Sequence, residues 1–254
     1  IKLTAAKVRI EDDIVIMRVT TFNEQTIPNL EDGMKATLKK TGVNEPKGFV
    51  LDLRNNPGGL LSVAISVTDL FLDQGEIVST RDREGKGERY KASKGDIANG
   101  KPLVILINAG SASASEIVAG ALQDHQRAIV LGTKSFGKGS VQSVLPMGQS
   151  GGIRLTTARY YTPSGRSIQA LGVTPDVFLE FKRVEEKEEE KRRTFSEADL
   201  EGALSNDSLT DSEKEMLRKE ELSFQETKKR RDKDNQLAHA IDLIEGLSVL
   251  SVKE

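Results

Sequence analysis

Apolar residues along this chain gather in short runs separated by glycine-rich turns and by amphipathic segments. Residues 49–53, FVLDL, and 103–107, LVILI, contain at most one polar residue each, which is typical of strands buried on both faces. Residues 128–132 form a third run of this kind. Helical patterns follow the first two runs, at 60–72 and 116–126. The alternation of strand, turn and helix predicts an α/β core of βα units with mostly parallel strands.

Strands of another kind are predicted on both sides of this core. Residues 1–22 predict two short strands joined by an acidic turn, and residues 140–162 predict two longer ones joined by GQSGG. Between the first pair and the core, residues 29–40 predict a helix. Asn29 is its expected N-cap, and Gly42 is expected to end it.

The composition changes after Phe181. The run KRVEEKEEEKRR has the mixed charge of a solvated linker or an exposed helix. Helical patterns resume from residue 198, and LAHAIDLIEGLSVL carries an apolar stripe formed by Leu237, Ile241, Ile244 and Leu247. Such a stripe packs either on the core or on another subunit. We therefore divide the chain into N-terminal strands at 1–28, an α/β core at 29–181, and a charged linker with C-terminal helices at 182–254.

The composition excludes several kinds of protein. The net charge of −2 does not indicate a nucleic-acid partner, and aromatic residues, at 4%, are too few for base-stacking platforms. The absence of cysteine excludes disulfides, cysteine-based zinc sites and a cysteine nucleophile. No apolar run is long enough to span a bilayer. The first residues lack the apolar core of a signal peptide, and Ile1 is not a natural start, so we expect a mature or truncated piece.

Ser113 is the first candidate for chemistry, because it lies in a turn between a predicted buried strand and a helix. With Glu116 it matches a capping box, a common way to begin a helix. The same geometry presents a hydroxyl at the carboxyl edge of the sheet, beside the free N–H groups of a helix N-terminus. Ser111 and Ser115 compete for this role on position alone.

A serine nucleophile needs a base, and the sequence offers few. The only histidines are His125 and His239, which leave little room for a histidine triad or a histidine-rich metal site. Lys138 is flanked by glycines, and on a following strand it would share one face with Gln142. A lysine acts as a base only when desolvation lowers its pKa well below about 10. The alternative is an ordinary surface lysine in a glycine turn.

Two other motifs match only in part. GTKSFGK, at 132–138, has the spacing of a phosphate-binding loop, but Gly139 follows where a magnesium-binding Ser or Thr is required. Ser135 and Lys138 have the SxxK spacing of penicillin-recognising enzymes, but the neighbouring glycines oppose the helix that this motif needs. These partial matches therefore predict no nucleotide site, and the sequence gives no reason to expect a cofactor.

Four blocks of sequence together resemble the carboxy-terminal processing proteases, also called tail-specific proteases. They are GFVLDLRNNPGG at 48–59, AGSASASEIVAGAL at 109–122, GTKSFGKGSVQ at 132–142, and TARYYTPSGRSIQ with GVTPDV between 157 and 177. The blocks stand in the family's order, and the likeness covers roughly residues 8–180. Ser113 and Lys138 are 25 positions apart, which is the family's usual spacing.

The resemblance implies a role for each candidate. Ser113 resembles the family's nucleophile, Lys138 its general base, and Gln142 the residue that orients the lysine. Gly59 and the amide of Ala114 resemble the oxyanion hole. The resemblance also implies a crotonase- and Clp-protease-like α/β core with additional strands, extended here by C-terminal helices. The implied function is a serine endopeptidase that cleaves protein or peptide substrates with free C-termini, near that end, without metal or ATP.

The chain departs from the family's pattern in one respect. Family members usually carry a PDZ module before the core, and here only the first residues resemble its last strand. Bacterial members are mostly periplasmic or otherwise extracytoplasmic, so we expect that location. In some relatives the C-terminal region mediates dimers, so a homodimer through these helices is a further expectation. A crotonase-like acyl-thioester enzyme and a catalytically inactive scaffold stay open as alternatives.

Overall fold

The computed structural model describes residues 4–148 and 151–182 and, with gaps, residues 210–251. The chain forms two compact units. The first comprises residues 1–180 together with 240–254, and the second comprises residues 181–239. The charged run predicted to be a linker lies, except for Lys182, outside the described residues.

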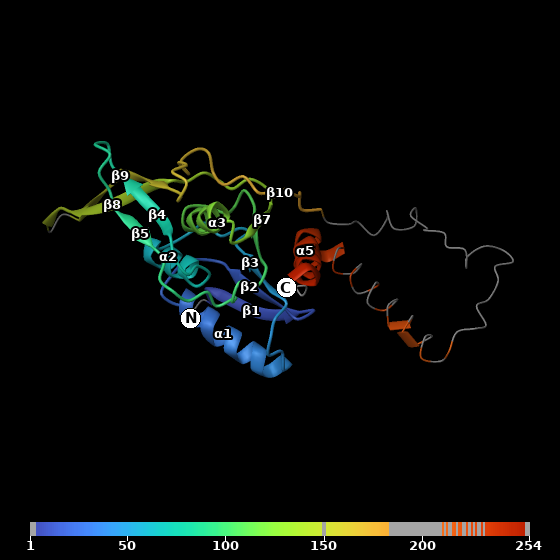
Figure 1. The fold of residues 1–254 in the computed structure, drawn as a ribbon. Coiled ribbons are helices and arrows are strands. Elements are labelled where there is room, and N and C mark those ends of the chain that lie inside the picture. The colour runs from blue at the N-terminus through green and yellow to red at the C-terminus, as the bar shows by residue number, and fades with distance from the viewer. Residues whose placement is uncertain are drawn as a thin grey trace. The chain divides into compact units, whose positions relative to one another are not determined.

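A six-stranded sheet forms the centre of the first unit (Figure 1). Its order is β1-β2-β3-β6-β7-β10, and every pair except β1 with β2 is parallel. The strands are β1 (Ala6–Glu11), β2 (Ile14–Val19), β3 (Gly48–Asp52), β6 (Leu103–Ile107), β7 (Ile129–Gly132) and β10 (Val177–Phe178). All residues of β3 and β6 are buried, which confirms the two central strands predicted from their apolar runs.

Three helices follow strands of this sheet along the chain. They are α1 (Thr26–Thr41) after β2, α2 (Leu61–Asp69) after β3, and α3 (Ala114–Asp124) after β6. The predicted end of α1 is confirmed, because Gly42 adopts a φ of 73° and its N–H bonds to Leu38 O. The predicted N-cap is wrong. Helix α1 begins at Thr26, and the Asn29 side chain instead accepts a hydrogen bond of 3.0 Å from Ala5 N. Asn29 thus ties the helix to the chain before β1.

A second, four-stranded antiparallel sheet has the order β5-β4-β9-β8. Its strands are β4 (Glu76–Arg81), β5 (Arg89–Lys91), β8 (Ser140–Pro146) and β9 (Gly152–Tyr161). Val141 and Tyr160 pack against the hydrophobic core at the base of the β8–β9 hairpin. Further along the hairpin, Val144, Leu145 and Leu155 are exposed. The predicted pair of long strands is confirmed, and most of the hairpin beyond its base lies outside the core.

The last helix, α5 (Asn235–Ser251), contributes its residues from 240 onward to the first unit. Ile241 and Ile244 of the predicted apolar stripe are fully buried there. A methyl group added at Gly48 would come within 2.5 Å of Ile244 Cγ2, so this helix packs directly on the start of β3. None of the described helices is both long and apolar enough to cross a bilayer.

Candidate active site

The candidate site is built on the turns that follow β3 and β6, neighbouring parallel strands whose carboxyl ends share one edge of the sheet. The two turns are joined directly. Asn108 Oδ1 accepts a hydrogen bond of 2.9 Å from Asn55 N, and its amide nitrogen donates one of 3.0 Å to Asn55 Oδ1. Residues 53 positions apart in sequence therefore form one platform.

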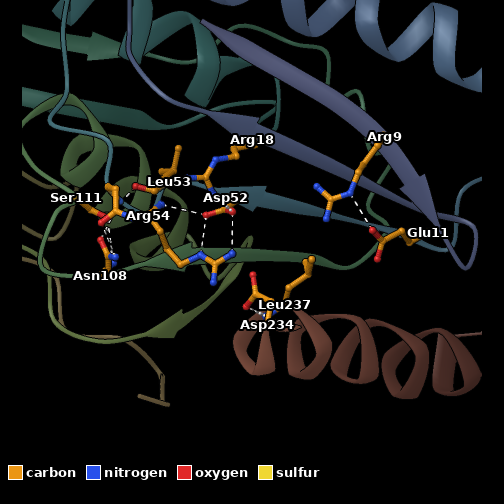
Figure 2. A network of polar contacts seen from close by, with 11 residues as sticks. Arg9, Glu11, Arg18, Asp52, Leu53, Arg54, Asn108, Ser111, Asp234 and Leu237 are labelled. Carbon is orange, nitrogen blue, oxygen red and sulfur yellow. Dashed lines mark hydrogen bonds and ion pairs between the residues drawn. The ribbon is translucent and has the colours of Figure 1, made fainter. Parts of the chain in front are cut away.

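An ion-pair cluster fixes the end of β3 just before this platform (Figure 2). Asp52 accepts hydrogen bonds from Arg18 of β2, at 2.6 Å, and from two guanidinium nitrogens of Arg54, both at 2.9 Å. The side chains of Asp52 and Arg54 are 6% and 8% exposed. A buried pair with several hydrogen bonds holds a fixed geometry, so the chain leaves β3 in a defined direction.

The structure separates the three competing serines by what their hydroxyls do. Ser111 and Ser115 are fully buried. Ser111 Oγ donates to Leu53 O at 2.8 Å, and Ser115 Oγ donates to Asn56 O at 2.9 Å. Ser113 is partly exposed, and its hydroxyl donates no hydrogen bond to any residue that the structure describes. Of the three, Ser113 alone has a hydroxyl proton available for chemistry.

The backbone at Ser113 is strained in the manner of an exposed nucleophile. Its φ is 56° and its ψ is −110°, outside the regions that non-glycine residues normally occupy. Ser113 and Glu116 form the predicted capping box, in which Glu116 Oε2 accepts the Ser113 N–H at 2.8 Å. The helix begins at Ala114, two residues before the predicted start. The turn thus presents Ser113 at the N-terminus of α3.

Two backbone N–H groups of these turns are candidates for binding an oxyanion. Among the described residues, neither the Ala114 N–H nor the Gly59 N–H makes a hydrogen bond. The Gly58 N–H is already bound to Asn56 Oδ1 at 2.9 Å. Gly58 brings the turn close instead, because a Cβ there would lie 2.9 Å from Ser113 Cβ and 3.0 Å from Ala114 N. This contact requires glycine, and sequence reasoning did not single out Gly58.

Asn56 connects the turn that follows β3, which contains Gly58 and Gly59 (the glycine turn), to the turn that follows β6, which contains Ser113 (the serine turn). It is fully buried, and its side-chain amide donates to Val19 O at 2.9 Å. Its backbone carbonyl accepts hydrogen bonds from Ala112 N at 3.0 Å and from Ser115 Oγ. The position of the free N–H groups relative to Ser113 is thereby fixed by hydrogen bonds to both turns.

Glu116 joins the serine turn to the loop that carries Lys138. Its carboxylate is fully buried and accepts four hydrogen bonds. Oε1 accepts from Ser135 Oγ at 2.5 Å and from Gly137 N at 2.6 Å. Oε2 accepts from Ser113 N and from Lys138 N, both at 2.8 Å. One carboxylate oxygen therefore holds the backbones of both proposed catalytic residues.

The Lys138 and Ser113 side chains are not joined. Within the described part of the chain, no hydrogen bond links Lys138 Nζ to Ser113 Oγ, and the lysine side chain is exposed. A lysine must lose water contact to become a base at neutral pH. The two backbones share Glu116 Oε2, and a dyad would require the amine to turn inward.

Gln142 lies on β8 and is exposed. Its neighbour Val141 packs on the core, so Gln142 is directed to the opposite face of the strand, as the alternation of side chains requires. Among the described residues it makes no hydrogen bond to Lys138.

The two histidines are engaged elsewhere. His125 Nε2 lies 2.7 Å from Glu76 O, and His239 Nδ1 lies 2.9 Å from Asn235 O. Neither forms a hydrogen bond with Ser113 in the part of the chain that the structure describes. These contacts thus join neither histidine to Ser113, whereas Lys138 shares Glu116 with it.

Comparison with known proteins places this arrangement in a family. Residues 13–179 match peptidase family S41. This chain belongs to peptidase family S41. The matched region contains both turns, α3, the Lys138 loop and the β8–β9 hairpin, so every residue of the candidate site lies inside it.

Curated relatives of the chain carry names that describe an activity. It is 53% identical over 205 residues to a carboxy-terminal-processing protease of Bartonella bacilliformis, covering 80% of this chain and 47% of that protein. It is 50% identical over 133 residues to a carboxyl-terminal-processing protease of Synechocystis, covering 52% of this chain and 31% of that protein. The chain spans about half, or less, of the length of these relatives.

A solved structure supports the same fold. The photosystem II D1 C-terminal processing protease superposes with a TM-score of 0.64 at 34% sequence identity, covering 71% of this chain and 49% of that one. The mixed α/β architecture predicted from the sequence is therefore shown.

Proposed function

We propose that this chain is the catalytic portion of a serine endopeptidase that cleaves proteins near their C-terminus through a Ser113/Lys138 dyad. The observation that carries the proposal is the shared Glu116 Oε2, which binds the backbone N–H groups of both residues. Membership of family S41 and the printed names of the relatives support the activity.

The proposed reaction passes through an acyl-enzyme. Neutral Lys138 Nζ takes the Ser113 Oγ proton while Oγ bonds to the scissile carbonyl carbon, and the N–H groups of Gly59 and Ala114 stabilise the oxyanion. The ammonium then protonates the leaving nitrogen as the C–N bond breaks. Water, deprotonated by the same amine, bonds to the ester carbonyl carbon, and the ammonium then protonates Ser113 Oγ as the ester C–O bond breaks. Gln142 is proposed to orient the amine in its inward position without adding a charge.

The arrangement described above corresponds to a resting state of this mechanism. In such a state the Lys138 side chain is exposed to water, and the N–H groups of Gly59 and Ala114 make no hydrogen bond among the described residues. Binding of substrate over the site would remove that water and favour the neutral amine.

The proposal is tested by cleavage of casein, an unfolded protein probe, followed by mass spectrometry. Ser113→Ala is expected to lower the rate by about 1,000-fold or more with an unchanged melting temperature. Lys138→Arg is expected to be as inactive, because guanidinium does not give up its proton. Lys134→Arg, at an exposed lysine in the same loop, is the matched control and is expected to keep full activity.

Other results would replace the proposal. Full activity of Ser113→Ala would exclude the dyad. Tight binding of an acyl-coenzyme A that does not depend on Lys138 would favour a thioester enzyme on a crotonase-like fold. Absence of cleavage by the wild-type chain together with an intact biological function of Ser113→Ala would favour a scaffold.

Three further expectations belong to the same proposal. The core is proposed to share the crotonase- and Clp-protease-like fold, and the protein to act outside the cytoplasm, both on the family resemblance. A homodimer through the C-terminal helices is also proposed. Because Ile241 and Ile244 are buried within the first unit, such a dimer has to use exposed residues of α5 such as Val249 and Leu250.

A further inference from the structure

Edge strands expose unpaired backbone groups, and proteins usually protect them by making them short or charged. In the described chain, three of the four sheet edges follow this rule. Strand β10 has two residues, β5 has three with the sequence RYK, and β1 carries Lys7, Arg9 and Glu11. Strand β8 differs, because its seven residues, SVQSVLP, include no charge. Its open edge is therefore a site where another strand can pair.

The register shows which residues of β8 face this edge. Tyr160 N donates to Gly139 O, and Met147 N donates to Gly151 O. These bonds flank the pairs Ser140–Arg159 and Pro146–Gly152, which are therefore pairs whose own N–H and C=O groups point away from each other. The bulge between these ends adds its extra residue to β9, so the alternation along β8 is uninterrupted.

It follows that Ser140, Gln142 and Val144 turn their N–H and C=O groups to the open edge. Pro146 falls on the same alternation, and there its missing N–H interrupts no bond to β9. Three successive outward-facing residues offer a ladder long enough to fix an extended peptide.

We infer that the open edge of β8 binds the backbone of the extended polypeptide substrate as an added strand. This rests on the proposed function. Strand β8 begins two residues after Lys138, so a peptide paired with Ser140 and Gln142 would run alongside the proposed base. Such pairing recognises main chain rather than side chains. The exposed side chains of Val144 and Leu145 favour an uncharged, apolar segment as the occupant.

The first test measures binding of casein to the uncleaving Ser113→Ala protein. Adding Val144→Pro removes one outward N–H while leaving the bonds to β9 intact. We expect it to weaken binding roughly tenfold. Val144→Thr keeps the N–H and suits a strand, and it is expected to bind within about twofold of the parent. Equal thermal unfolding of the two variants would show that the hairpin is preserved.

The second test changes the peptide. A peptide from casein that the wild type cleaves at one bond is prepared with a single amide N-methylated at each position in turn. Methylation is expected to weaken binding at every second residue along the stretch that faces β8. In the Val144→Pro protein, methylation of the amide that donates to the carbonyl of residue 144 is expected to weaken binding further, because proline removes only the N–H of residue 144 and keeps its carbonyl.

The outcomes separate this inference from the proposed function. Casein binding that is sensitive to Val144→Pro, without cleavage by the wild type, would support the added strand and overturn the protease. Cleavage with equal binding by the Pro and Thr variants would overturn the added strand. Loss of a wild-type dimer in Val144→Pro, with casein binding unchanged, would assign the edge to a second copy of the chain and overturn the inference.

Discussion

Glu116 is the residue on which the geometry of the candidate site depends most directly. A fully buried carboxylate is costly unless hydrogen bonds satisfy it, and here four donors from two segments do so. Because these donors include the backbone N–H groups of Ser113 and Lys138, the spacing of the two residues follows from this one side chain.

Glu116→Gln is expected to destabilise the protein by about 3 kcal/mol, because an amide has one acceptor oxygen where four donors converge. It is also expected to lower the casein cleavage rate roughly 100-fold at a temperature where the variant is folded. Urea unfolding and kinetics on the same preparation measure the two effects. Glu31→Gln, at an exposed glutamate of α1, is the control and should change neither. Normal kinetics in Glu116→Gln would show that the positioning role is wrong.

The sequence predicted part of this residue-scale picture. The spacing of Ser113 and Glu116 indicated a capping box, and the structure confirms it. Spacing within one helix turn carries no information about partners 19 to 22 residues away, so the contacts to Ser135, Gly137 and Lys138 were not predictable. Gly58 was missed for the same reason. A side chain is excluded there by contact with Ser113 and Ala114, which belong to a turn distant in sequence.

At the scale of elements, the turn at 162–166 is attached to the C-terminal end of α3. Asp124 Oδ2 accepts the Ser164 N–H at 2.9 Å, and its other oxygen pairs with Arg166. Burial alone would raise the pKa of Asp124, but hydrogen bonds from Thr162 and Ser164 and the charge of Arg166 outweigh it, so the pKa lies below its ordinary value. The ionised form thus stabilises the attachment of the turn.

This attachment predicts a pH dependence. A carboxyl whose pKa is lowered by folding contributes stability that is complete above its unfolded pKa of about 3.9 and is lost as the pH falls through the folded value. Asp124→Asn is therefore expected to reduce the free energy of unfolding by about 1–2 kcal/mol at pH 7 and by progressively less below about pH 4. Urea titrations at several pH values measure this. Asp32→Asn, at an exposed position of α1, is the matched control for the loss of one carboxylate, and a gap for Asp124→Asn that widens in acid would contradict the assignment.

Most elements were predictable because their signals are local. The buried strand at 103–107 matches β6 residue for residue, since an uninterrupted apolar run between turn residues marks both of its ends. The start of α1 was missed because asparagine is a common N-cap residue, which made Asn29 the expected start. Its side chain instead accepts a hydrogen bond from Ala5 N, a long-range contact that no local pattern reveals. The order of the strands in each sheet likewise depends on contacts between distant segments.

At the scale of the whole molecule, residues 240–251 of the C-terminal helix and the sheet that carries the site belong to one compact unit. Ala240, Ile241 and Ile244 are fully buried, and Ile244 lies against Gly48 at the start of β3. The carboxyl end of β3 leads into the glycine turn of the site. The helix therefore supports, from the opposite end of the strand, the sheet on which the chemistry is built.

Ile244→Ala is expected to lower the free energy of unfolding by about 3 kcal/mol, because it leaves a cavity that the rigid start of β3 cannot fill. Leu171→Ala, at a side chain that is 59% exposed outside this helix, is the control and should stay within about 0.5 kcal/mol of the parent. Urea unfolding at two protein concentrations tenfold apart distinguishes burial of the apolar stripe of α5 against its own chain from burial against a second subunit. A loss that is independent of concentration is expected, since the contact lies within one chain. A loss that grows on dilution would mean that Ile244 stabilises a dimer instead, and the helix would then have to be assigned to an interface.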